Sequence, residues 1–130
     1  MMPSKVREGF LKIRKVWPDA ELSSDFTALK IPAINLPRQY NYRSTPLLIL
    51  IDHTSDYTPP RAYVRRDLRI YNPLTGSYVR SSALPEELTE QYLLDAGWVY
   101  VCIRIDDWGP HRDLRDFLLI VLRFLKELKS

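Results

Sequence analysis

Apolar residues in the N-terminal segment recur at helical spacing. Intervals of four, three and four residues line up one side of a helix through Val6, Phe10, Ile13 and Trp17. Ser4 is suited to cap the start of this helix, and Pro18 closes its end. The remaining sides are strongly basic, with Lys5, Arg7, Lys12, Arg14 and Lys15. This basic face is either a solubilising surface or a docking site for an acidic protein.

Short apolar segments bounded by proline or polar turn residues predict strands in the middle of the chain. They cover residues 27–31, 45–51, 61–64 and 67–71. The second segment is apolar without alternation, which predicts a central position in its sheet. Residues 52–60 form a loop in this scheme, because Pro59 and Pro60 have no N–H to donate to a neighbouring strand.

The last third of the chain changes from one helical pattern to a strand pattern and back. Residues 84–94 predict a short helix with Pro85 in its first turn, ended by Gly97 shortly after. Residues 98–105 alternate as a strand does. One face then carries Val99, Val101, Ile103 and Ile105, and the other carries Trp98, Tyr100, Cys102 and Arg104. A turn at residues 106–110 leads into an amphipathic helix over residues 112–129.

This order of elements predicts an α+β fold, an antiparallel sheet with its helices mostly on one face. A chain of 130 residues makes one domain, residues 1–130. The longest apolar runs, residues 47–51 and 117–122, are far shorter than the roughly 20 residues of a membrane span. The single cysteine excludes an internal disulfide, and residues 1–5 lack the apolar run of a signal peptide. We therefore expect a cytoplasmic protein without a membrane segment.

Signatures of cofactor and metal chemistry are missing. The chain has no glycine-rich phosphate loop and no paired-cysteine zinc motif, and its only histidines are His53 and His111. The acidic residues at 106–107 and at Asp113 and Asp116 occupy a turn and a helix start, where carboxylates occur as capping groups. We expect neither a metal nor a cofactor.

Cys102 is the one good nucleophile in the chain. A thiol becomes reactive when it is partly exposed and has a cationic neighbour, and Arg104 lies on the same strand face. A cysteine in an apolar strand is more often core filler. The sequence leaves both interpretations open.

Residues 63–71 mix basic and aromatic side chains, as surfaces that bind single-stranded nucleic acid do. A formal net charge of +3 is too low to support that function. A sheet edge guarded by charged side chains explains the pattern as well. A nucleic-acid-binding or scaffold module is kept as a third functional class.

Several segments together resemble the ubiquitin-conjugating enzymes. Residues 47–51 and Tyr57-Thr58-Pro59-Pro60 are similar to a strand and the proline-rich loop of that family. Trp108-Gly109-Pro110 is similar to its Trp-Ser-Pro turn, which precedes a helix. A closer likeness, through residues 31–41, Gly97-Trp98 and Asp113, is to the prokaryotic family E of ubiquitin-conjugating-like proteins. The resemblance implies a ubiquitin-conjugating (UBC) fold and two partners, a ubiquitin-like modifier and its activating enzyme.

Two registers are open for the nucleophile that the resemblance implies. Counted from Gly97 and back from Trp108, the place of the catalytic cysteine falls on Tyr100, as in inactive variants that bind ubiquitin without a thioester. We expect such a non-catalytic variant. The alternative register makes Cys102 the thioester nucleophile, with Asn72 as a partial match to the asparagine of the family's His-Pro-Asn motif.

The resemblance also outlines a partner-binding surface. The basic first helix matches the helix that docks on the activating enzyme. Loop and strand residues near the active site extend this surface, namely Tyr57, Pro59, Pro60, Tyr100, Trp108 and Pro110. The aromatic and proline side chains among them can instead serve to lock their loops.

Overall fold

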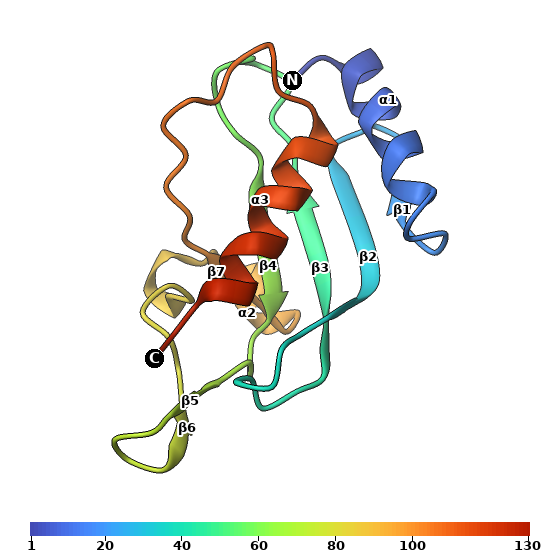
Figure 1. Cartoon of the computed structure of the whole chain (residues 1–130). Coiled ribbons are helices and arrows are strands. Elements are labelled where there is room, and N and C mark those ends of the chain that lie inside the picture. Colours follow the sequence, from blue (N-terminus) through green and yellow to red (C-terminus); the bar gives the residue numbers. More distant parts are fainter.

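Five strands form an antiparallel sheet at the centre of the protein, in the order β1-β2-β3-β4-β7. This computed structural model describes all 130 residues. The strands are β1 (Glu21–Leu22), β2 (Ala28–Asn35), β3 (Ser44–Leu50), β4 (Arg61–Arg65) and β7 (Trp98–Val101). The first four form a meander, and β7 returns to pair with β4 (Figure 1). The central position predicted for residues 45–51 is confirmed.

Two long helices cover one face of this sheet (Figure 1). They are α1 (Pro3–Arg14) and α3 (Leu114–Glu127). The α+β class and the placement of these two helices are confirmed. The helix start was predicted incorrectly, because Met2 occupies the cap position of α1 and Ser4 lies inside the helix. The cap of α3 is as predicted: Asp113 accepts a hydrogen bond from the main chain of Asp116, whose side chain bonds back to Asp113.

Burial explains why the predicted apolar stripes become these helices. Val6 and Ile13 of α1 and Leu118 and Val121 of α3 are buried in one core with the inward side chains of the strands. Trp17 lies beyond the end of α1 and is half-buried against the same core. Removing this apolar surface from water is the main stabilising contribution that the sequence pattern encodes.

Gly9 allows α1 and α3 to approach closely. A Cβ atom added at Gly9 would lie 2.8 Å from Leu114 Cβ and 3.0 Å from the Leu114 main-chain nitrogen. Real Cβ atoms do not approach that closely, so any larger residue would push the two helices apart.

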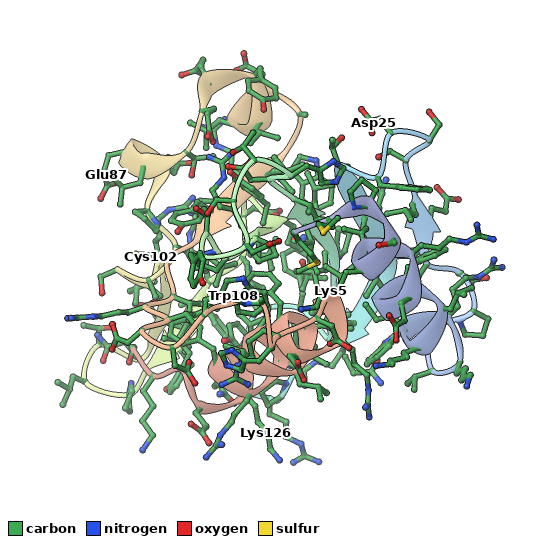
Figure 2. The ribbon with its side chains drawn as sticks, turned by 90° about the horizontal axis from the view of Figure 1, so that it is seen from above. Lys5, Asp25, Glu87, Cys102, Trp108 and Lys126 are labelled. Atoms are coloured by element: carbon green, nitrogen blue, oxygen red, sulfur yellow. The ribbon has the colours of Figure 1, made fainter.

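The predicted helix over residues 84–94 is broken into two short pieces on the other face of the sheet (Figure 2). These are the 3-10 helix η1 (Glu86–Leu88) and α2 (Gln91–Asp95). Thr89 between them has extended backbone angles and is buried. Its hydroxyl donates to the Pro85 carbonyl at 2.8 Å and accepts the Tyr100 N–H at 2.9 Å. Thr89 thus joins Pro85, before η1, to Tyr100 of the edge strand β7, and the helix is not continuous at this residue.

The strand predicted at residues 67–71 becomes part of a separate hairpin, formed by β5 (Ile70–Asn72) and β6 (Ser77–Val79). Gly76 adopts a positive φ of 70° in its turn, a conformation that favours glycine. The strand predicted at residues 98–105 is shorter than expected, since β7 ends at Val101. The alternation of its faces is confirmed in β7, where Val99 and Val101 are buried and Trp98 and Tyr100 are half-buried.

Candidate functional site around Cys102

Cys102 lies at the point where the chain leaves the sheet. Its N–H donates to the Ala83 carbonyl at 2.8 Å, outside the ladder that joins β7 to β4. Its thiol is free and exposed, and Figure 2 shows the residue at the edge of the molecule. The core-filler interpretation is therefore wrong, and the thiol is accessible to a reaction partner.

The cation that the sequence places beside Cys102 is paired elsewhere. Arg104 is 89% exposed and pairs with Asp106 at 3.0 Å. His53 is used elsewhere, with its Nε2 atom 2.7 Å from the Phe26 carbonyl oxygen. The thiol itself makes no hydrogen bond. Cys102 is thus exposed, and Arg104, the cation expected to activate it, is bound to Asp106 instead.

Asn72 is not brought to Cys102. Its side-chain oxygen accepts the Leu74 N–H at 3.0 Å within the β5–β6 turn. This hairpin extends beyond the end of the sheet where β7 begins, whereas Cys102 follows the opposite end of β7 (Figure 1). The asparagine therefore supports its own turn.

Tyr100 lies directly opposite Tyr63 of β4. Both are on the outer face of the sheet, the face that α1 and α3 do not cover. The two ring centroids are 5.7 Å apart. Burial, and to a smaller extent the nearby Cys102, raises the pKa of the Tyr100 phenol above its usual value. The hydroxyl is therefore neutral at physiological pH, and Tyr100 cannot replace a thiolate as a nucleophile.

A polar cluster next to Tyr100 was missed by the sequence reasoning. Glu90 accepts one hydrogen bond from Arg61 at 2.6 Å and another from the Tyr63 hydroxyl at 3.2 Å. Burial raises the pKa of Tyr63 well above its usual value. The period of two along β4 does place Arg61 and Tyr63 on one face, but no sequence pattern indicates that Glu90 reaches them.

A small groove borders the chain segment that contains Cys102. Its volume is about 200 Å³. The proline loop and the residues on either side of Cys102 form its walls, with Thr58, Pro59, Pro60, Arg61, Ala62, Tyr100, Val101, Ile103, Ile105 and Phe117. The fold thus places the proline loop and the Cys102 segment side by side.

The loop residues expected to bind a partner differ widely in exposure. Trp108 is 7% exposed, and its ring packs edge-on against Phe117 with centroids 5.9 Å apart. Pro60 is also buried. Both residues hold their loops in place and offer little contact surface. Tyr57, at 73% exposed, and Pro110 remain accessible, with Pro59 half-buried.

The basic face of α1 is largely free. Arg7, Arg14 and Lys15 are exposed and form no ion pair with a carboxylate, and Lys5 is half-buried. Arg14 lies over the Phe10 ring, 5.7 Å from its centroid. Lys12 is occupied, because its ammonium bonds Asp113 at 2.8 Å.

No protein-family model, curated protein or solved structure matches this chain. None of its helices combines the length and the apolar character needed to cross a bilayer. No three histidine, cysteine, aspartate or glutamate side chains lie together in a way that could hold a metal ion.

Proposed function

We propose that this protein is a ubiquitin-conjugating-enzyme-like protein of a prokaryotic ubiquitin-like modification pathway. In this proposal it binds the modifier or its activating enzyme and does not carry the modifier itself. The proposal starts from the sequence resemblance. The order of a basic helix, a meander, a proline loop, a cysteine segment and a long helix is compatible with it.

The surroundings of Tyr100 and Cys102 support a non-catalytic role over a catalytic one. Tyr100 stands where the resemblance places the nucleophile, and its phenol is neutral and packed on Tyr63. Asn72, the oxyanion donor that the resemblance implies, bonds Leu74 within its own turn, and His53 lies against the Phe26 carbonyl. The loss of one oxyanion donor typically costs about 3 to 4 kcal/mol of transition-state stabilisation.

The free charges on α1 supply the docking surface for this role. Arg7 and Lys15 have no carboxylate partner in the protein, so an acidic partner meets no internal competitor. Unpaired surface cations accelerate association with an acidic protein and make it sensitive to salt. The accessible side chains of Tyr57 and Pro110 can add apolar contact.

A binding and charging experiment tests the proposal. The protein is incubated with ATP and with the modifier and activating enzyme encoded nearest to its gene, and adducts are separated on a gel with and without reductant. We expect no reductant-sensitive adduct, and equal partner binding by the wild type and Cys102→Ala.

Charge reversal locates the docking surface. The double variant Arg7→Glu, Lys15→Glu should weaken binding at least tenfold if two charge contacts of about 1 kcal/mol each become repulsive. Arg38→Glu, an exposed arginine in the β2–β3 connection, is the matched control. Failure of the wild type to bind either partner would refute the proposal.

The exposure of Cys102 favours a second candidate, an active conjugating enzyme. The Cys102 thiolate would attack the thioester carbonyl of the charged activating enzyme. A new carbon–sulfur bond forms, the old one breaks, and the activating enzyme regains its free thiol. A reductant-sensitive adduct that disappears in Cys102→Ala would establish this candidate in place of the first.

A further inference from the structure

A polar hollow lies beside Gly97, at the end of β7 opposite Cys102. Its volume is about 540 Å³, and no apolar side chain lines it. We call it the arginine pocket, formed by Arg65, Arg66, Asp67, Arg69, Arg80, Glu86 and Gly97. These residues come from the end of β4, the turn after it, the segment after β6, η1 and the residue before β7. The fold thus brings Arg80, from a separate part of the chain, to the three arginines of residues 65–69.

The two carboxylates of the arginine pocket do not balance its four arginines. Asp67 pairs with Arg65 at 2.9 Å. Glu86 is shared between Arg66 and Arg80. Among the side chains that line the pocket, four are positive and two are negative, and the carboxylates of Asp95 and Glu87 act on Arg66 and Arg80 from outside the lining.

Arg69 is the arginine without an acidic partner. Its guanidinium donates to the main-chain carbonyls of Arg66 at 3.2 Å and Leu68 at 3.1 Å, and it forms no ion pair. These bonds use one of its terminal nitrogens, Nη1. The remaining N–H groups of Arg69 are available to an external acceptor.

Arg80 shows that the positive charges act on one another. Its side chain is 24% exposed, compared with 44% for Arg66. Burial and then the nearby charge of Arg69 lower the pKa of Arg80 below its usual value. An anion in the pocket would remove this repulsion and compensate the lost hydration.

We propose that the arginine pocket binds a small phosphate-sized dianion, free phosphate or a phosphomonoester. The guanidinium group is planar and presents paired N–H donors, which match the oxygen atoms of a phosphate. The excess of arginines over carboxylates in the lining favours a doubly charged anion. The site involves no residue of the proposed partner surface, so it goes beyond the proposed function and can be tested separately.

The shape and lining of the arginine pocket favour a small ligand over a nucleic-acid strand. Strand-binding surfaces combine a basic track with aromatic rings on which bases stack. No aromatic residue lines this pocket. The Tyr42 ring is covered by Arg65, whose guanidinium carbon lies 3.4 Å from the ring centroid.

Calorimetric titration of the full chain with inorganic phosphate, at constant ionic strength, tests the proposal. We expect saturable binding that is about tenfold weaker in Arg69→Gln, which removes one charged donor and no ion pair. Arg104→Gln removes the same charge outside the pocket and should change the affinity less than twofold. Arg69→Lys should recover part of the loss. Unfolding curves of Arg69→Gln that match the wild type verify that the variant is folded.

Two further titrations identify the source of the phosphate group. A phosphomonoester such as glycerol phosphate should bind with the same dependence on Arg69, and a single-stranded oligonucleotide should not. The proposal is overturned if phosphate shows no saturable binding, if Arg104→Gln weakens it as much as Arg69→Gln does, or if only the oligonucleotide depends on Arg69. None of these outcomes alters the charging experiment on Cys102.

Discussion

The two faces of the central sheet are stabilised in different ways. The inner face, under α1 and α3, buries aliphatic side chains such as Ile49 and Val99 among the apolar residues of α3. The outer face, near η1 and α2, is organised by hydrogen bonds of Thr89 and Glu90 to residues of β4 and β7. Apolar burial contributes stabilising free energy without requiring a strict geometry, whereas hydrogen bonds between defined partners fix the positions of the groups that they join. The inner face therefore holds the fold together, and the outer face positions the segment that leads to Cys102.

Truncation of Phe117 should have the largest effect on stability. This ring is buried on the inner face and packs against Trp108. Phe117→Ala should lower the free energy of unfolding by about 3 to 5 kcal/mol, measured by urea denaturation. Leu119→Ala, on the exposed side of the same helix, should change it by less than about 0.5 kcal/mol. Similar losses of unfolding free energy in the two variants would contradict the assignment of Phe117 to the buried side of α3 and Leu119 to its exposed side.

Enlarging Gly9 should be destabilising although alanine is the better helix former. An exposed helical Gly→Ala change stabilises by up to about 1 kcal/mol. At Gly9 the added methyl meets the Cβ and main chain of Leu114, so we expect a loss of about 1 to 3 kcal/mol by the same denaturation assay. Glu8→Ala, an exposed neighbour on α1, controls for helix propensity. A gain in stability for Gly9→Ala would show that the two helices can separate freely.

Removal of the Thr89 hydroxyl tests the outer face. Thr89→Val keeps the shape of the side chain but leaves the Tyr100 N–H and the Pro85 carbonyl without this partner. The expected loss is about 1 to 3 kcal/mol. Thr75→Val, which removes an exposed hydroxyl in the β5–β6 turn, should stay within about 0.5 kcal/mol of the wild type. Equal effects at the two sites would argue against a fixed outer face.

Glu90 should produce the smallest effect, and it should depend on pH. Its own main-chain N–H and the Arg61 guanidinium hold the pKa of Glu90 below its ordinary value of 4.5. Because the folded state binds the proton less readily than the unfolded state, the contribution is complete above pH 4.5 and is lost as the pH falls further. Glu90→Gln should cost less than about 1 kcal/mol at pH 7, since the pair is partly exposed.

The pH dependence of that difference provides the readout. The stabilities of the wild type and Glu90→Gln should converge as the pH falls below 4.5. Glu127→Gln, in an exposed ion pair of α3, is the control that measures how the loss of a carboxylate elsewhere changes the free energy of unfolding. A gap between the wild type and Glu90→Gln that stays constant with pH would contradict the proposed role of the charge.

Most of the inner face could be predicted from the sequence. The spacing of Val6 and Ile13 and the apolar face of residues 112–129 depend on nearby residues alone, so periodicity identifies both long helices. The central strand follows for the same reason. The exact start of α1 was missed because Pro3 and Ser4 are both acceptable in a first turn, and only Pro3 begins the helix.

The outer face and the site depend on contacts between distant segments. Thr89 interrupts the expected helix because it bonds Tyr100, a partner that helix propensity does not consider. The sequence did indicate a basic cluster at residues 63–71, but Arg80 and Glu86 join it only through the fold. The exposure of Cys102 likewise follows from the end of β7 at Val101, which no local pattern marks.

The exposure of Cys102 also makes the protein convenient to label. It is the only cysteine of the chain, so a maleimide fluorophore or spin label attaches at one known position without any other substitution. The label would lie beside the proline loop groove, next to the proposed docking residues. It would block thioester formation while leaving Tyr57 and the basic face of α1 unchanged. A labelled protein that still reports partner binding would therefore separate recognition from transfer in a single sample.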